Sequence, residues 1–332
     1  MVIRKSLREA ILLFIYPRFA SSITSQISSI LDQLMQTRDK EAIRRILISH
    51  GLFRQDEWKK FEDLNKIETC LIEMYEQEYD RFNFYMPEDL KKFLEDFKTI
   101  RDCKNLKTLL RCIVNGVPAE DMPKMLGSKG KVNYENLKIL SQHLDHQEMI
   151  RDAMQYLPSE IVSGIENGDK ATLDDFEVTI ERAAARYIIE RCSIIRTENS
   201  EKIRNIIGLR YEIKDISTIA RLKKAQLPHE RINSQIIGQH VRLSNEDLQA
   251  LISAQNYNSF YNELQSTHYG TKLPETPIKP LDLELALNKM LIDEMHGLQT
   301  SIQETPITRF VLSLENKYQT IWKALALSFI GG

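Results

Sequence analysis

Apolar residues recur at intervals of three and four along most of the chain. One such stripe runs through Ile23, Ile27, Ile30, Leu31 and Leu34, and another through Leu90, Phe93, Leu94 and Phe97. Side chains at these intervals share one face of a helix, so the spacing predicts amphipathic helices. Runs that alternate between apolar and polar residues are nearly absent. The pattern therefore predicts an all-α protein.

Caps and helix breakers divide this pattern into elements. Pro87-Glu88-Asp89 predicts a helix start, because proline and acids favour the first turn. Ser244, with Asp247 three residues later, resembles a capping box. Stretches rich in glycine or proline predict loops at residues 127–130, 164–168 and 274–280. Long helices are expected near residues 176–196 and 283–300.

A segment of about one third of the chain recurs some 110 positions later. Residues 105–120 align with residues 215–230 without a gap, and residues 133–137 align with 244–248 after one inserted residue. A later block, 176–180, aligns with 283–287 and upstream with 67–71, and an eroded third copy of the first block lies at 320–331. Because the register survives an insertion, homologous repeats explain the similarity better than chance.

The repeats predict three similar helical-bundle domains. We expect them at residues 1–103, 104–213 and 214–313, with the first completed by a C-terminal helix near 314–332. A length of 332 residues suits three units of this size. Each unit is long enough to bury a core of its own.

Charge and cysteine content exclude several classes of function. Lysine and arginine number 45 against 47 acidic residues, for a net charge of −2, so no overall basic field would attract nucleic acid. Cys70, Cys103, Cys112 and Cys192 show no CxxC spacing, which argues against a zinc site or a thioredoxin-like centre and suits a reducing cytoplasm.

The N-terminal region superficially imitates a signal peptide, because basic residues precede the apolar run at 10–16. That run is short and is stopped by Pro17. No stretch approaches the roughly 20 apolar residues that cross a bilayer. We therefore expect a cytoplasmic protein with, at most, peripheral contact with a membrane.

Signals for catalysis are weak. The pair Asp174-Asp175 suggests an acidic magnesium motif, but Val178 stands where a third aspartate would be needed, so a solvated helix start explains the pair better. His143 and His146 form an HxxH with Glu148 nearby, yet no third ligand on a facing helix is evident. Phosphate-binding and nucleophile motifs are absent. We expect no catalytic, cofactor or metal residues and no small-molecule substrate.

The repeated helix keeps an apolar edge in all three copies, at Leu106, Leu109 and Leu110, at Ile216, Ile219 and Ala220, and at Ile321, Ala324 and Leu325. The basic residues of its polar edge are candidates for a partner interface: Lys104, Lys107, Arg111, Lys214 and Arg221. Two interpretations stay open. Either this edge is solvated or paired with acids of a neighbouring helix, or Arg111 and Arg221 face a shared central surface and bind the acidic or carbonyl-rich ends of a partner.

Several stretches resemble one known family. They are FKTIRDCKNLKTLLRCIVNGVP from residue 97, LRYEIKDISTIARLKKAQLP from residue 209, STHYG from residue 266, Tyr16-Pro17-Arg18 and the C-terminal LENKYQTIWKAL. Together they are similar to the C subunit of archaeal-type and bacterial V-type ATP synthases, the relative of the d subunit of eukaryotic V-type ATPases. The terminal copy departs from the internal ones at Thr320, Trp322 and Ala326.

The resemblance implies a funnel-shaped helical protein of three domains with pseudo-threefold symmetry. It also implies a non-catalytic place in the central stalk, on the cytoplasmic face of the membrane, in a complex that couples ion transport to ATP synthesis or hydrolysis. The implied partners are the shaft subunits of the soluble ATPase head and the proteolipid rotor ring. The main alternative is an unrelated helical-repeat scaffold or adaptor, although such repeats usually span about 20 to 50 residues. A helical enzyme ranks third.

Overall fold

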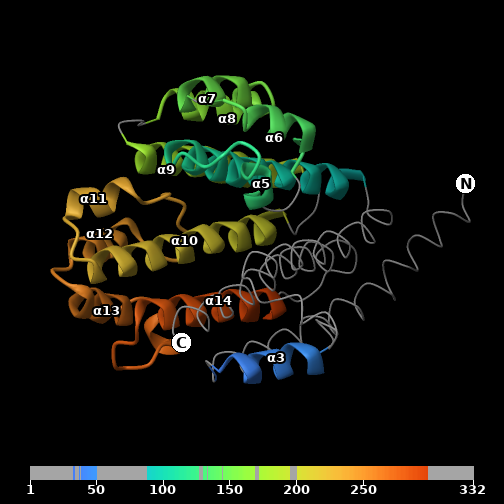
Figure 1. Ribbon diagram of the computed structural model, residues 1–332. Helices are drawn as coiled ribbons and strands as arrows, with labels where there is room; N and C mark the ends of the chain where they lie inside the picture. The colour runs from blue at the N-terminus through green and yellow to red at the C-terminus, as the bar shows by residue number, and fades with distance from the viewer. Residues whose placement is uncertain are drawn as a thin grey trace, which may run out of the picture. The chain divides into compact units, whose positions relative to one another are not determined.

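The computed structural model describes residues 39–50, 88–126, 130–132, 134–143, 145–168, 172–194 and 200–297, together with residues 33 and 37. Throughout these ranges the regular structure is helical, without a strand, which confirms the all-α prediction (Figure 1). The chain divides into two compact units. One comprises residues 92–196 and 204–287, and the other residues 1–91, 197–203 and 288–332.

Two successive series of helices make up most of the described chain. Repeat A denotes residues 88–194 and contains α5 (Glu88–Val114), η3 (Met122–Met125), α6 (Tyr134–Leu140), α7 (His146–Met154), α8 (Ser159–Glu166), α9 (Leu173–Arg191) and η4 (Cys192–Ile194). Repeat B denotes residues 200–297 and contains α10 (Ser200–Lys224), α11 (His229–Ser234), α12 (Asn245–Ser253), α13 (Tyr257–Gln265), η5 (Gly270–Lys272) and α14 (Pro280–Gly297). Helix α3 (Lys40–Ser49) precedes both.

Corresponding helices of the two repeats keep the spacing of the sequence alignment. Helices α5 and α10 end at residues 114 and 224, which are 110 positions apart. Helices α7 and α13 are 111 positions apart at both ends, and α9 and α14 begin 107 apart. The boundaries predicted at 103/104 and 213/214 fall inside α5 and α10. The division into three domains stays a prediction.

The two long first helices end in the same turn. After α5 the amides of Gly116 and Val117 donate to the carbonyls of Ile113 and Cys112, at 3.0 and 2.9 Å. The matching amides after α10, those of residues 226 and 227, donate to residues 223 and 222, at 3.1 Å each. This is the Schellman arrangement, in which the residue after the helix adopts a left-handed conformation. Gly116 has φ 66°, and Gln226, at the same position of repeat B, has φ 57°.

Helix α3 starts in the same way as α7 and α13. Asp39, Asp145 and Asn256 cap the three helices, and each side chain accepts a hydrogen bond from a first-turn amide. Four residues after each cap lies a buried apolar side chain, at Ile43, Met149 and Phe260. These features support a third copy around α3, while the threefold arrangement remains a prediction.

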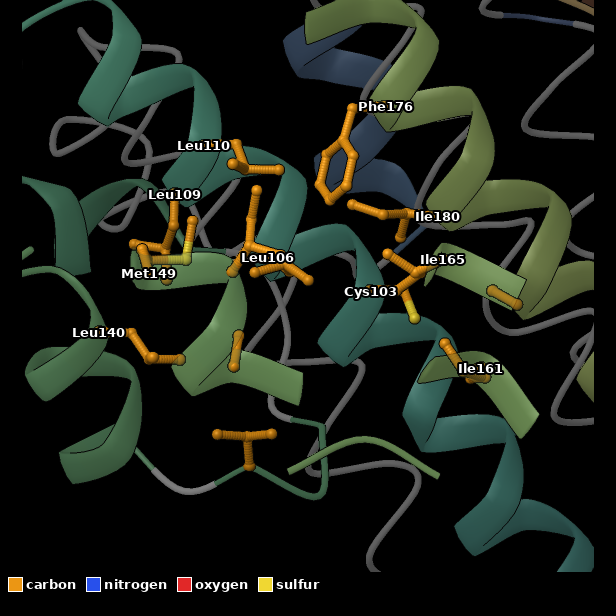
Figure 2. Packing of buried hydrophobic residues seen from close by; sticks show 14 of the residues in the cluster. Cys103, Leu106, Leu109, Leu110, Leu140, Met149, Ile161, Ile165, Phe176 and Ile180 are labelled. Carbon is orange, nitrogen blue, oxygen red and sulfur yellow. The ribbon is translucent and has the colours of Figure 1, made fainter. Parts of the chain in front are cut away.

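The core of repeat A gathers the apolar edges of its five helices, as Figure 2 shows for Leu106, Leu109, Leu110, Leu140, Met149, Ile161, Ile165, Phe176 and Ile180. The matching apolar edge of α10, at Ile216, Ile219 and Ala220, is fully buried. Each side chain of leucine size that is removed from water contributes about 1.5 to 3 kcal/mol. The core positions predicted in these two copies are confirmed, whereas those at 321–325 lie outside the described residues.

Most of the predicted caps and loops agree with the structure. The capping box at Ser244 and Asp247 forms, and α5 begins at Glu88. The loop predicted at 164–168 is wrong in its first part, because α8 continues to Glu166. A Cβ at Gly164 would lie 2.8 Å from the Cβ of Ala183. This glycine therefore lets α8 pack closely on α9 and does not break the helix.

Candidate partner interface

The long helices of the two repeats are, in chain order, α5, α9, α10 and α14. Ion pairs join α5 to α9, α9 to α10 and α10 to α14. Their polar side chains form what we call the charged seam, defined as Lys104, Lys107, Arg111, Glu177, Glu181, Lys214, Thr218, Arg221 and Glu284. All five basic residues proposed from the sequence belong to it. Each of them lies on the polar edge of a helix whose opposite edge is buried.

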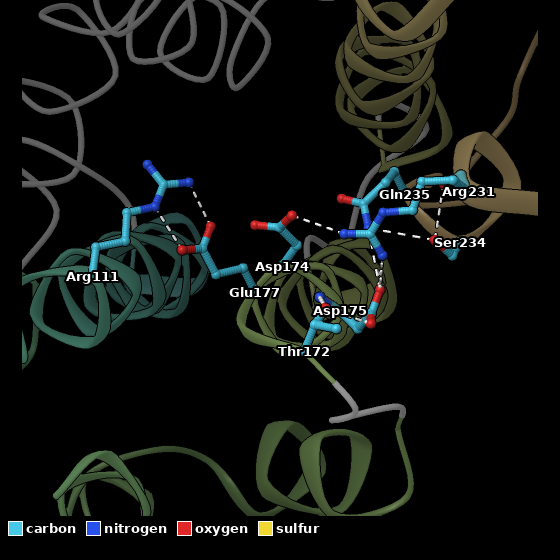
Figure 3. Close-up of polar contacts among 8 residues, drawn as sticks. All are labelled: Arg111, Thr172, Asp174, Asp175, Glu177, Arg231, Ser234 and Gln235. Carbon is cyan, nitrogen blue, oxygen red and sulfur yellow. Dashed lines mark hydrogen bonds and ion pairs between the residues drawn. The ribbon is translucent and has the colours of Figure 1, made fainter. Parts of the chain in front are cut away.

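Arg111 of α5 pairs with Glu177 of α9 at one end of the charged seam. Its Nε and Nη2 donate to the two carboxylate oxygens in a bidentate pair (Figure 3), the geometry that suits arginine and carboxylate. The Arg111 side chain is 64% exposed, while Glu177 is 8% exposed. Donation of these hydrogen bonds to the Glu177 carboxylate raises the pKa of Arg111.

Repeat B contains the equivalent pair. Arg221 of α10 donates from Nη1 to Glu284 of α14 at 2.8 Å and from Nη2 to Thr218 at 3.2 Å. Arg221 is 51% exposed and Glu284 is 13% exposed. Arg111 and Arg221 are 110 positions apart and their partners 107 apart, as in the alignment of the two repeats. Each repeat therefore presents a half-exposed guanidinium above a mostly buried glutamate.

Glu181 of α9 lies at the centre of the charged seam. It pairs with Lys107 of α5 at 3.0 Å and with Lys214 of α10. Burial by itself would raise the pKa of Glu181, but the two lysines outweigh this effect and lower it to about 2. Lys104 is half-buried and acts electrostatically on Lys214. Glu181 therefore stays ionised and links helices of both repeats.

A second set of contacts joins the other side of α9 to repeat B. Arg231 of α11 pairs with Asp174 at 2.8 Å and Asp175 at 2.6 Å (Figure 3). Arg182 of α9 donates to the carbonyls of Ser234 and Ile236 at 2.9 and 2.7 Å. The hydrogen bond from Thr172 has the largest effect on the pKa of Asp175. Together with the hydrogen bond from Arg231, it holds that pKa below its ordinary value. Asp174 and Asp175 thus form a helix start tied to α11.

Sequence reasoning proposed the basic side chains of the charged seam and missed the acidic ones. The alignment of 176–180 with 283–287 contained a usable signal, because Glu177 matches Glu284 in it. Of the two interpretations left open, the contacts agree with pairing to acids of a neighbouring helix. Binding of a partner by the exposed guanidinium groups remains a proposal.

The described part of the chain contains no cluster of three histidine, cysteine or acidic residues placed to hold a metal ion. His143 contacts Asp152 at 2.9 Å and Glu148 at 3.9 Å. The side chain of His146 lies outside the described residues. Among the helices that the structure describes, none combines the length and the apolar character needed to cross a bilayer.

Comparison with known proteins identifies the family. The chain is 23% identical over 272 residues to the C subunit of the A-type ATP synthase of Methanosphaera stadtmanae, an alignment that covers 78% of this chain and 67% of that protein. It is 23% identical over 283 residues to the protein of the same name from Methanocaldococcus jannaschii, covering 81% and 70%. Over 170 residues it is 27% identical to that of Methanosarcina mazei, covering 51% and 45%. The profile of the family described as ATP synthase (C/AC39) subunit matches residues 28–318, nearly the whole chain, and the protein therefore belongs to this family.

Proposed function

We propose that this chain is a non-catalytic component of the central stalk of a rotary A/V-type ATPase, where it couples the rotor shaft of the soluble head to the membrane proteolipid ring. The observation that carries the proposal is the family match over residues 28–318. The relatives named above all carry the name of the C subunit of an A-type ATP synthase. In this role the chain sits peripherally on the cytoplasmic face of the membrane and serves ion transport linked to ATP synthesis or hydrolysis.

The packing of the described helices supports a mechanical role. Helix α9 is tied to α5 by Arg111 and Lys107, to α10 by Lys214, and to α11 by Arg231. Closely packed interiors have low compressibility and transmit strain. A force applied to one repeat would therefore pass into the other without large deformation, as a rotating coupler requires.

The charged seam is the surface that we propose for a partner. Its basic residues outnumber its acidic ones, so it favours a partner that offers carboxylates or helix C-terminal carbonyls. Arg111 and Arg221 are both more than half exposed. Arginine is enriched among residues that dominate binding energy, because its planar group binds oxygen pairs. The two guanidinium groups are therefore the proposed points of contact.

Reconstitution with purified shaft subunits and a proteolipid ring tests both proposals. The full-length chain should bind both partners and should appear between them by cryo-microscopy. Absence of binding to either partner would contradict the stalk role. The double variant Arg111→Gln, Arg221→Gln should weaken binding by about tenfold or more, since each contact of this kind contributes about 1 kcal/mol or more.

A matched control is Lys138→Gln with Arg151→Gln, which removes the same charge from exposed positions on α6 and α7. This control should bind like the unmodified chain. Equal binding by the unmodified chain and the double arginine variant would remove the charged seam as the contact surface and leave the stalk role standing. The alternative of a scaffold unrelated to rotary ATPases loses its basis, because the family match covers nearly the whole chain.

A further inference from the structure

Repeat A contains a contact between two sulfur atoms near the end of α5. The Cys112 thiol of α5 donates to Sδ of Met125 in η3, and the two sulfur atoms lie 3.5 Å apart. Leu222 stands at the position of α10 that matches Cys112, so repeat B carries no thiol there. Neither sulfur residue belongs to the charged seam, although Cys112 directly follows Arg111.

The two residues of this contact differ in their exposure to water. Cys112 is 5% exposed and belongs to the apolar core of repeat A, whereas Met125 is 51% exposed. Met122, at the other end of the same short helix, is 4% exposed and belongs to that core. Of the methionines whose side chains the structure describes, only Met125 is exposed.

The two sulfur groups also differ in their reactivity toward peroxide. A thiol reacts as its thiolate, and burial raises the pKa of Cys112, so this thiol stays protonated at neutral pH and reacts slowly. A thioether has no proton to lose, and the exposed Met125 can meet the oxidant directly. The hydrogen bond from Cys112 uses one of the two lone pairs on Sδ, so the other lone pair can take up oxygen.

We propose that Met125 is a site of oxidation by hydrogen peroxide and that its oxidation exposes Cys112. Peroxide transfers one oxygen atom to Sδ. The O–O bond breaks, an S–O bond forms, the thioether loses two electrons and the peroxide is reduced to water. The sulfoxide is polar, and its oxygen accepts hydrogen bonds from water. The flexible side chain then turns toward solvent and leaves the Cys112 thiol without its cover.

Peptide mapping by mass spectrometry, after treatment of the full-length chain with hydrogen peroxide at pH 7, tests the first step. Trypsin cleaves after Lys124 and so places Met122 and Met125 in different peptides. Met125 should gain one oxygen about tenfold faster than Met122, its buried neighbour in the same short helix, because the oxidant reaches it without opening of the core. Oxidation of the two methionines at equal rates would overturn the proposal.

Labelling of Cys112 with N-ethylmaleimide tests the second step. Catalase first removes the peroxide, and dithiothreitol then reduces any cysteine sulfenic acid or disulfide, leaves the sulfoxide in place and is removed before labelling. Cys112 should react about fivefold faster than in the untreated chain, because an exposed thiol is more reactive than a buried one. Cys103, which is buried on the same helix, should keep its slow rate. Unchanged labelling of Cys112, or a parallel rise at Cys103, would overturn the proposal.

Two variants sharpen the experiment. Met125→Leu keeps the volume of the side chain and removes the sulfur, so Cys112 should label slowly both before and after peroxide. Met125→Gln places a polar group at this position and should speed the labelling of Cys112 without peroxide. An equal response to peroxide in Met125→Leu and in the unmodified chain would assign the effect to another residue and contradict the proposal. If Met125→Gln fails to fold, the comparison of the unmodified chain with Met125→Leu still decides.

Discussion

Each repeat has a short connection before its second group of helices, residues 130–132 in repeat A and 241–243 in repeat B, which we call its strap. The amides of the first strap donate to Asp102 of α5, and those of the second donate to Glu212 of α10. This difference between aspartate and glutamate accompanies a change in the strap itself. The short Asp102 side chain requires the backbone to come close, and the strap carries glycine at residue 130. The longer Glu212 reaches further, and the matching strap position carries Val241, which is 41% exposed. Side-chain length and backbone distance have changed together, so the same contact survives in two different sequences.

The charged seam shows the opposite case, in which one contact is kept and its neighbour is not. Arg111 and Arg221 each pair with the matching glutamate of the next long helix. Lys107 of repeat A pairs with Glu181, whereas repeat B carries Ser217 at the matching position, and the Ser217 hydroxyl is buried with no hydrogen-bond partner among the described residues. The repeats thus share their outer ion pairs and differ in the centre of the charged seam.

The largest expected change in stability comes from neutralising the carboxylates that hold the two straps, Asp102 and Glu212. Glu212→Gln should lower the free energy of unfolding by about 4 kcal/mol. The three strap amides at 241–243 and the Tyr269 hydroxyl would all lose a charged acceptor. Asp102→Asn should lower it by about 1 kcal/mol, because it has two strap amides as donors and its ionised form is already disfavoured by burial. Urea denaturation of the two variants at pH 7.5 measures the difference. A larger loss for Asp102→Asn would contradict this ranking.

The next largest change in stability is expected at the centre of the charged seam, at Glu181, and a smaller one at its end, at Glu177. Glu181→Gln should cost about 3 kcal/mol, because it leaves Lys107 partly buried beside an uncharged amide. Glu177→Gln should cost about 1 kcal/mol or less, because its partner Arg111 is 64% exposed and its charge is screened by water. Thermal or urea unfolding at pH 7 checks the order. Equal losses would show that the two pairs contribute alike.

The pH dependence of Glu181 follows from its lowered pKa. Its ionised form stabilises the fold fully above its ordinary pKa of 4.5, and this contribution is lost as the pH falls toward 2. The unmodified chain should therefore lose about 3 kcal/mol from this residue between pH 4.5 and pH 2. Glu181→Gln lacks a titrating carboxyl at this position. Its stability should accordingly depend less steeply on pH over this range.

The smallest effect compares the turns that end α5 and α10. Gln226→Gly should raise the stability by about 0.5 to 1 kcal/mol, because Gln226 has φ 57° and a residue with a Cβ is strained there. Gly116→Ala should lower it by about 1 kcal/mol at φ 66°. Unfolding midpoints of both variants test the pair. Changes of the same sign would mean that the two turns are not equivalent.

Much of the fold followed from patterns that act over a few residues. The capping box at Ser244 and the buried edges at 106–110 and 216–220 were predicted because caps and helix faces depend on neighbours within one or two turns. The prediction failed at Gly164, where a glycine serves close packing against Ala183 of another helix. Nothing within a few residues of Gly164 indicates that neighbour.

The ion pairs of the charged seam join residues that are far apart in the sequence, so local patterns could predict only one partner of each pair. Spacing placed Lys107, Arg111 and Arg221 on one edge of repeated helices, because helical geometry makes that edge a property of local sequence. Glu177 and Glu284, the partners of the two arginines, lie 66 and 63 positions away from them, and Glu181 lies 74 positions from Lys107. Such pairs form only when packing of the apolar faces has brought α9 and α14 beside α5 and α10. Local sequence therefore determined which side chains were available, and the packing of the helices determined which of them meet.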